Sequence, residues 1–530
     1  MQRSTAGLIA FGIIFAILLA FGVRFFEGVW TFPSSWKVPL MIIALVGTGV
    51  FITIKLGFPQ IRYFWHGVKV TMGIYDNPED KGDLNHFRAL TTALSATVGI
   101  GNIAGVATAL YYGGPGALFW MWITAFFGTA LKYAECSLSL KYREFDADGF
   151  TAGGPMYTIE HGLGRRWRWL AVAFASFAVI CSFATGNAIQ SFTVSDQIYS
   201  EVTQLVGNAH FLTTKYQLWA GFDLSVQQVI NGLFMAVMVG LVIIGGIKRI
   251  GHVTGYLAPI MAIIYVVAAI AILLAHVNQL SASLGLVFQY AFNPPAQLAG
   301  VGSGIFLTLL WGIKRGLYSN EAGQGSAAIA HSTAKTPYPI REGSVAMLGP
   351  FIDTILICSL TGLVIIVTGA WRQTEYFVRL SETDPEMVKQ ILAASTYHGK
   401  PLLNSSLLTS YAFRAGLSWL FNYGDKIVTI SVLLFAVSTA ISWSFYGDRS
   451  AEYLFGIKAI KPYRWIYVTF VFIGGIASLE AVWAFGDAAL GFMTFPNLLT
   501  IILLSTALKK MTRKYFSVDH QPYVSPTERG

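Results

Sequence analysis

Apolar segments of about 20 residues recur along this chain, and that length matches the thickness of the hydrocarbon core of a membrane. Charged residues make up only 12% of the sequence and the mean hydropathy is +0.57, whereas a soluble domain is roughly 25% charged. We therefore predict an all-α polytopic membrane protein with about twelve transmembrane helices. The predicted spans are residues 6–26, 38–57, 88–111, 115–140, 168–193, 226–246, 252–276, 299–330, 343–370, 424–446, 464–482 and 485–508.

The net charge of +9 comes from Lys and Arg residues that are unevenly distributed between the loops. They are frequent in segments 58–88, 139–168, 447–464 and 509–530, whereas segment 277–298 holds none. Because basic loops stay in the cytoplasm, we predict a bacterial-type inner-membrane protein with both termini cytoplasmic. The basic excess then reflects topology, and we expect no nucleic-acid partner. Segment 6–26 is predicted to be a retained helix, and a cleaved signal peptide stays open as the alternative.

Two of the predicted spans are interrupted by glycine-rich segments. Residues Ala96–Gly105 read Ala-Thr-Val-Gly-Ile-Gly-Asn-Ile-Ala-Gly, and residues Gly316–Ser326 read Gly-Leu-Tyr-Ser-Asn-Glu-Ala-Gly-Gln-Gly-Ser. Non-helical backbone survives at membrane depth only where it is buried in protein or lines a cavity. The alternative is that these glycines only allow close helix packing. That alternative explains a single glycine pair better than two breaks in corresponding positions.

The two breaks divide the chain into similar halves. Each break opens a group of five spans, residues 88–276 and residues 299–508, and an odd number of spans reverses the orientation of the second group. This predicts a five-plus-five inverted repeat, the pattern of many secondary transporters. Two leading helices and a cytoplasmic linker (1–87) precede the repeats, and a cytoplasmic tail (509–530) follows. A surface helix is expected near residues 404–418.

The first break offers groups for both ends of an amino acid. A restarting half-helix presents N–H groups, here those of Gly101, Asn102 and Ile103, which favour a carboxylate. The carbonyls from about Ser95 to Val98 suit an ammonium group or a sodium ion. The small Gly99 and Gly101 leave room for the backbone of a ligand.

The second break is expected to form the opposite wall, with Leu317, Tyr318 and Ser319 facing the side chain of the substrate. Glu321 is a charged residue at membrane depth and is therefore a functional candidate. A structural ion pair of Glu321 with Lys314 or Arg315 remains open.

Other polar residues lie within the predicted spans. Gln190, Ser438 and Thr439 are among them, and Trp443 follows Thr439 by one helical turn. The two hydroxyls can alternatively bond to their own helix four residues back. Glu135 and Asp353 are intramembrane acids to which the sequence assigns no role. No His–Asp, Ser–His or metal-ligand spacing appears in the spans, so we do not expect an enzyme.

Several long motifs resemble the sodium:alanine/glycine symporter family. The resemblance runs from about Gly47 to Leu508, and its motifs are Leu90–Thr108, Gly113–Gly128, Lys314–Ser326, Ala330–Thr336 and Pro350–Thr354. It implies a five-plus-five fold of the leucine-transporter type. It also implies sodium-coupled symport of a small neutral amino acid, alanine or glycine, into the cell.

The resemblance further implies the residues of the site. It places the amino-acid backbone at the Thr97–Asn102 break and puts Gln190 and Trp443 in the pocket. A sodium site would combine the carbonyls near Ser95 and Val98 with the hydroxyls of Ser438 and Thr439. Sodium would be the coupling ion, and no nucleotide motif is present. A sodium- or proton-coupled glutamine carrier, with Glu321 or Asp353 titrating in the proton-coupled case, and a non-transporting amino-acid sensor stay open as alternatives.

Overall fold

The structure is a computed structural model, and it describes residues 40–145, 149–219, 222–293, 304–382, 384–477 and 479–523. The predicted span 6–26 lies outside these residues. The described chain is mostly helical, with three short antiparallel hairpins. The hairpins pair β1 (Glu144–Phe145) with β2 (Thr151–Ala152), β3 (Lys215–Trp219) with β4 (Phe222–Ser225), and β5 (Thr396–Tyr397) with β6 (Lys400–Pro401).

The helices before residue 300 include α13, which forms in segment 277–298, where a loop was predicted. They are α2 (Leu40–Leu56), α3 (Pro59–Arg62), α4 (Phe64–Thr71), α5 (His86–Thr97), η1 (Ile100–Asn102), α6 (Ala104–Gly113), α7 (Ala117–Lys141), α8 (Pro155–Tyr157), η2 (Thr158–Leu163), η3 (Arg165–Trp167), α9 (Arg168–Phe183), η4 (Ala184–Ala188), α10 (Ile189–Val206), α11 (Val226–Ile243), α12 (Gly246–Ala275) and α13 (Val277–Phe292). Asn85 caps α5, and a Ser225–Gln228 capping box starts α11, as these residue types do at helix N-termini.

The second half repeats this pattern of long and interrupted helices. Its helices are α14 (Gly304–Asn320), α15 (Ser326–His331), α16 (Pro339–Ala346), α17 (Leu348–Pro350), η6 (Phe351–Cys358), α18 (Ser359–Val367), η7 (Ala370–Gln373), α19 (Glu375–Ser381), α20 (Pro385–Ala394), α21 (Ser405–Leu417), α22 (Gly424–Phe455), η8 (Ile457–Ala459), α23 (Ile460–Ile476) and α24 (Leu479–Phe516). The helix expected near 404–418 forms as α21, but it is largely buried against α22 and is not a surface helix.

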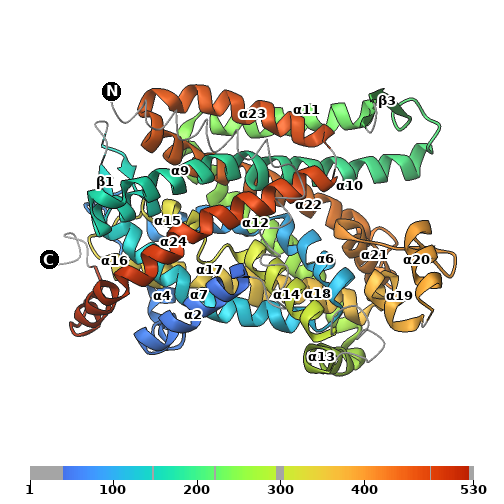
Figure 1. Cartoon of the computed structure of the whole chain (residues 1–530), viewed down its shortest axis with the longest axis horizontal. Coiled ribbons are helices and arrows are strands. Elements are labelled where there is room, and N and C mark those ends of the chain that lie inside the picture. The colour runs from blue at the N-terminus through green and yellow to red at the C-terminus, as the bar shows by residue number, and fades with distance from the viewer. Residues whose placement is uncertain are drawn as a thin grey trace.

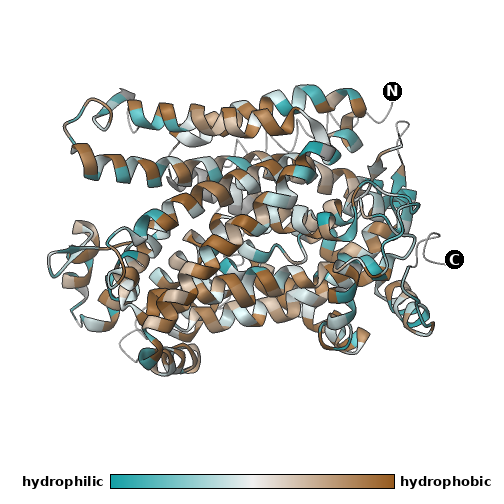
Figure 2. Ribbon diagram, turned by 180° about the vertical axis from the view of Figure 1, so that it is seen from behind, coloured by the Kyte–Doolittle hydropathy of each residue, from teal (hydrophilic) through white to brown (hydrophobic). Residues whose placement is uncertain are grey.

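Most helices run along the long axis of the molecule, whereas α13 lies across it (Figure 1). One end of the bundle holds β1, α16 and the C-terminal part of the chain, and the opposite end holds β3, α19 and α20 (Figure 1). Hydrophobic residues dominate the middle of the helices and hydrophilic residues gather at the two ends (Figure 2). This is the distribution of a protein whose helices cross a membrane.

Six helices in the described ranges are long and apolar enough to cross a membrane, or seven if the bent pair α5–α6 counts as one span. They are Arg165–Val206, Val226–Ile243, Arg249–Ala275, Pro339–Val367, Gly424–Phe455 and Ala489–Phe516. The prediction of a helical membrane protein with a broken helix is confirmed at this level.

Candidate functional site

The first break lies where the sequence predicts it. The axis of His86–Thr97 bends by 51° relative to Gly101–Gly113. Asn102 holds the turn together, because its side-chain Oδ1 accepts the N–H of Gly99 at 2.9 Å while its own N–H donates to the Gly99 carbonyl at 3.2 Å. The N–H of Ile103 donates to the carbonyl of Ile100. Two of the three amides expected to face a carboxylate are therefore used within the break itself.

The second break begins later than predicted. Helix α14 stays regular through Gly316 and ends at Asn320, and the non-helical segment is Glu321–Gly325. Glu321, Gly323 and Gly325 have φ angles of 53°, 80° and 87°, in the left-handed region that ends a right-handed helix. Gly316 serves another purpose: a Cβ at this position would overlap the side chain of Thr124 and lie 3.2 Å from Met121 Cα. It permits the close packing of α14 on α7.

Side chains from other helices hold the second break. Glu135 of α7 accepts the N–H of Gly325 at 3.1 Å and the side-chain amide of Asn497 at 2.8 Å. Asn497 of α24 also donates to the Gly323 carbonyl at 2.9 Å. Lys132 Nζ lies 3.6 Å from Glu135 Oε1, and both side chains are buried. Glu135 thus replaces the helical partner that Gly325 loses at the break.

Glu321 is bonded to neutral partners rather than to a cation. Its carboxylate accepts Ser326 Oγ at 2.5 Å and Trp443 Nε1 at 3.0 Å. The Arg315 guanidinium lies instead over the rings of Trp311 and Tyr318. In the described part of the chain, the ion pair of Glu321 with Lys314 or Arg315 does not form.

The first break contacts the last turn of α14, directly before the second break, at Gly101. A Cβ there would lie 3.2 Å from Tyr318 Cδ1 and 3.4 Å from Ser319 Cα. Asp353 of η6 joins the same two segments, because Asn102 Nδ2 donates to Asp353 Oδ1 at 2.6 Å and Ser319 Oγ donates to Asp353 Oδ2 at 2.8 Å. The Asn102 and Ser319 side chains, expected at the substrate, are therefore held by this buried acid.

Helix α22 reaches the first break at Gly99. A Cβ on Gly99 would overlap Thr439 Oγ1 and would lie 3.6 Å from Gln190 Oε1. The Thr439 hydroxyl donates to the Ser95 carbonyl at 3.1 Å, across to α5 and not to its own helix. Three further polar atoms are buried without a hydrogen-bond partner among the described residues: Ser95 Oγ, Ser438 Oγ and Gln190 Oε1. Burying polar groups without a hydrogen-bond partner destabilises the fold unless a ligand, an ion or a water molecule binds to them.

The remaining predicted residues are buried but differ in where they lie. Thr97 directs its hydroxyl to the carbonyls of Ala93 and Leu94 in its own helix. Leu317 packs in a separate apolar cluster with Leu45 and Ile313, whereas Val98 and Tyr318 belong to the main cluster. Trp443 is 0% exposed and contacts the second break through Glu321.

Sequence reasoning missed three contributors to the site. The role of Asp353 and that of Glu135 depend on partners far away in the chain. Thr409 of α21 donates to the Ile103 carbonyl at 3.1 Å. An isolated acid at membrane depth was the one available signal for the first two. The described residues contain no His, Cys, Asp and Glu cluster that could hold a metal ion.

Residues 25–527 match the family model described as the sodium:alanine symporter family. The chain is 40% identical over 482 residues to the sodium/alanine symporter AgcS of Methanococcus maripaludis, covering 90% of this chain and 94% of that protein. It is 32% identical over 483 residues to the probable sodium/glutamine symporter GlnT of Bacillus subtilis, covering 90% and 88%. The crystal structure of MhsT in complex with L-phenylalanine aligns with 81% of this chain and 99% of that chain, at a TM-score of 0.45 and 13% identity.

Proposed function

The chain belongs to the sodium:alanine symporter family, a family of multi-pass membrane transporters and not of enzymes, and we propose that it couples inward sodium flow to uptake of alanine or glycine. The observation that carries this proposal is the contact of Thr439 with the Ser95 carbonyl beside Gly99. It joins α22 to the first broken helix through oxygen atoms alone. Such oxygen ligands suit a hard cation such as sodium.

The proposed sodium site consists of the Ser95 and Val98 carbonyls and the Ser438 and Thr439 hydroxyls. Its support is that Ser438 Oγ is buried without a partner among the described residues and that Thr439 already lies against Ser95. An ion bound to both α5 and α22 favours the conformation in which these helices are close. Sodium binding would thereby shift the conformational equilibrium of the transporter.

The proposed amino-acid site lies on the other side of Gly99. Gly99 and Gly101 would face the backbone of the substrate, with Thr97 and Asn102 at the two edges of the break. Gln190, Tyr318 and Trp443 would surround the side chain, and Leu317 and Ser319 would contribute through their backbone. The tight packing here, where a Cβ on Gly101 would lie 3.2 Å from Tyr318 Cδ1, supports a small substrate.

Within this function we also propose the finer architecture. Residues 88–276 and 299–508 would form a five-plus-five inverted repeat of the leucine-transporter type, preceded by segment 1–87 and followed by the tail 509–530. The protein would lie in an inner membrane with both termini cytoplasmic. A sodium ion entering through a potential of 100 mV releases about 2.3 kcal/mol, which alternating access would use to accumulate the amino acid.

Radiolabelled alanine uptake into proteoliposomes tests this function. We expect accumulation above equilibrium with an inward sodium gradient and none when potassium replaces sodium. Thr439→Ala should raise the sodium concentration required about tenfold or more, because a hydrogen-bonding partner of a charge is worth roughly 1.5–3 kcal/mol. Thr494→Ala is the matched control, since that buried hydroxyl donates to the Leu490 carbonyl in its own helix.

The remaining outcomes separate the alternatives. Sodium-dependent accumulation of glutamine without alanine would support the glutamine carrier. Uptake that follows a proton gradient without sodium would support proton coupling through Glu321 or Asp353. Binding of alanine with no accumulation under either cation would contradict transport and support the amino-acid sensor.

A further inference from the structure

The two broken helices are joined a second time, far from the site, at the end of the bundle that carries α16 and the C-terminal segment. The residues before α5 pair with those after α15: the N–H groups of Asp83 and Leu84 donate to the Thr333 carbonyl, and the Lys335 N–H donates to Leu84. Arg143 links the two segments, because its guanidinium donates hydrogen bonds to the backbone carbonyls of Lys81, Ser332, Ala334 and Thr336. The loop charges assign this end to the cytoplasm.

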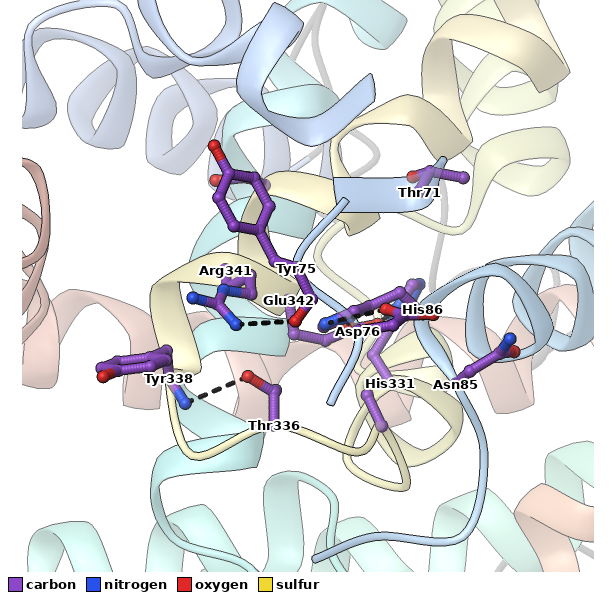
Figure 3. Close-up of polar contacts among 12 residues, drawn as sticks. Thr71, Tyr75, Asp76, Asn85, His86, His331, Thr336, Tyr338, Arg341 and Glu342 are labelled. Atoms are coloured by element: carbon purple, nitrogen blue, oxygen red, sulfur yellow. Dashed lines mark hydrogen bonds and ion pairs between the residues drawn. The ribbon is translucent and has the colours of Figure 1, made fainter. Parts of the chain in front are cut away.

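A buried carboxylate, that of Glu342, lies between the imidazoles of His86 and His331, which adjoin the paired segments in the chain (Figure 3). Glu342, in the first turn of α16, accepts His86 Nδ1 on one oxygen and His331 Nδ1 on the other. His86 is the first residue of α5 and His331 is the last residue of α15. Exposure is 0% for Glu342 and 1% for each histidine. The cluster therefore fastens one end of each broken helix to a single carboxylate.

Neither nearby arginine forms an ion pair with Glu342 among the described residues. Arg341 donates to the Tyr75 carbonyl (Figure 3) and to the Tyr515 hydroxyl, and the Arg143 guanidinium donates to four backbone carbonyls. With both imidazoles neutral, the cluster keeps one buried negative charge, which is unfavourable. A proton on either imidazole makes the cluster neutral while both hydrogen bonds stay in place. Imidazole is the side chain that gains a proton near neutral pH.

His86 has a place for this proton. Its Nε2 is buried without a hydrogen-bond partner among the described residues and lies 3.9 Å from Asp76 Oδ1. An imidazolium here would sit between two carboxylates. The Asp76 side chain is 29% exposed, so it connects the cluster to water. Burial raises the pKa of Asp76; the His86 charge opposes this and the Glu342 charge adds to it.

Other charged and titratable groups lie on the segments that neighbour the cluster. They are His66 and Lys69 of α4, Asp76, Asp80 and Asp83 before α5, Arg88 of α5, Cys136 of α7 with Arg143 after it, Arg249 and His252 of α12, Arg341 of α16, and Tyr515 and His520 of the C-terminal segment. Helix α22 also packs on α5 and α15; its Asp448 pairs with Arg464 of α23, and its Arg449 pairs with Glu452. Burial lowers the pKa of His66 to about 4, so His66 stays neutral near pH 7 and is not the proton acceptor.

We propose that His86, Glu342 and His331 form a proton-binding clasp that closes the cytoplasmic ends of both broken helices and must open for release of the substrate. The proposal rests on the proposed function, because an opening clasp has a role only in alternating access. The closed clasp holds a proton that the separated, hydrated side chains release. Higher cytoplasmic pH therefore favours opening, and lower pH favours closure. Internal acidity would slow release.

Hydrogen exchange of the full-length protein tests the clasp. Peptides covering residues 81–86 and 331–336 would be followed at pH 6 and pH 8, with rates corrected for the intrinsic pH dependence of exchange. For one linked proton, the opening equilibrium should rise by up to about tenfold per pH unit. The double variant His86→Gln/His331→Gln, which has no imidazole in the clasp, and Glu342→Gln should each remove this difference. His520→Gln is the matched control, because His520 stacks on Tyr515 nearby but lies outside the clasp.

Each outcome decides between the clasp and its alternatives. Equal corrected exchange at both pH values in the unmodified protein would overturn the proposal. A pH difference that persists in His86→Gln/His331→Gln would also overturn it, since the proton would then reside on another group such as Asp76. This double variant keeps the test valid if Glu342→Gln does not fold. Sodium-driven alanine uptake, measured on the same preparation, tests the proposed function separately. A pH-dependent clasp without uptake would contradict the transport function and still support the clasp.

Discussion

The two breaks both interrupt a helix, and different groups replace the lost helical hydrogen bonds at each of them. At the first break, the side chain of Asn102 and the glycines of the segment itself provide most of the bonds. At the second break, Glu135, Asn497 and Trp443 reach in from three other helices. A break whose backbone hydrogen bonds are made within the segment can keep its conformation while the surrounding helices move. A break whose hydrogen bonds come from other helices changes conformation when those helices move.

This difference suggests which break responds to which ligand. The first break touches α22 mainly through Thr439, the contact that sodium would strengthen. The second break is attached to α7, α22 and α24 together, so a rearrangement of the bundle reaches it directly. Asp353 joins the first break to the end of α14 through Asn102 and Ser319. Under the proposed function, a sodium ion would act at the first break, and movement of the bundle would reach the second one.

The largest expected effect comes from filling the space at Gly99. In Gly99→Ala the new methyl group would overlap the Thr439 hydroxyl, and close-packed interiors do not absorb such an overlap without movement. We expect sodium-driven alanine uptake to fall about 100-fold or more, since overpacking of roughly 3 kcal/mol corresponds to that factor. Initial rates in proteoliposomes, normalised to the amount of inserted protein, measure this.

Gly105→Ala is the matched control for Gly99→Ala. Gly105 lies in α6 next to the same break, and nothing lies within 4 Å of a Cβ built on it. Alanine is favoured over glycine in a helix by roughly 0.5–1 kcal/mol, so this variant should keep its activity and gain stability. Equal loss in both variants would show that the break requires flexibility along its length rather than the specific contact of Gly99 with Thr439.

The second break should be destabilised when its contacts with other helices are removed. Glu135→Gln leaves the buried Lys132 ammonium without its counter-charge, and breaking a buried ion pair costs about 3–5 kcal/mol. We expect a lower unfolding temperature in detergent and faster hydrogen exchange in residues 321–325. The double variant Lys132→Met/Glu135→Gln should recover part of the stability, because no unpaired charge remains. Similar stability of the single variant and the unmodified protein would contradict a supporting role for this pair.

The comparison of the breaks also explains what the sequence could predict. The first break depends on local features, the Gly-x-Gly pattern followed by Asn102, and its position was predicted correctly. The start of the second break was predicted too early, because a glycine that packs on a neighbouring helix, such as Gly316 on α7, looks the same in sequence as one that ends a helix. The supports of the second break lie far away in the chain: Gly325 is 190 positions from Glu135 and Gly323 is 174 from Asn497. No local pattern encodes such pairs.

The predicted site residues are brought together to different degrees for the same reason. Thr439 and Ser95 are 344 positions apart, and their pairing could be expected only from the resemblance to a family. Asn102 and Ser319 were expected at the substrate because they lie in the breaks. Their bonds to Asp353 depend on η6, which the sequence does not place beside them. Leu317 lies on the other side of α14, in the cluster with Leu45.

The smallest expected effect comes from Trp443→Phe, which removes one of the two hydrogen bonds to Glu321. A phenyl ring replaces the indole, so part of the packing against Gly186 is kept, and the Glu321 carboxylate keeps its hydrogen bond from Ser326. Losing one donor to a buried charge costs roughly 1.5–3 kcal/mol. Because Trp443 links α22 to the second break, we expect a moderate loss of stability and a clear loss of uptake rate. Trp122→Phe, which removes a bond to the neutral Ser359 hydroxyl at 2.7 Å, is the control and should lose about 1 kcal/mol of stability or less with little change in uptake. If both variants lose stability equally and neither changes the uptake rate, the bond of Trp443 to Glu321 has only a packing role, and the second break does not depend on α22 for its motion.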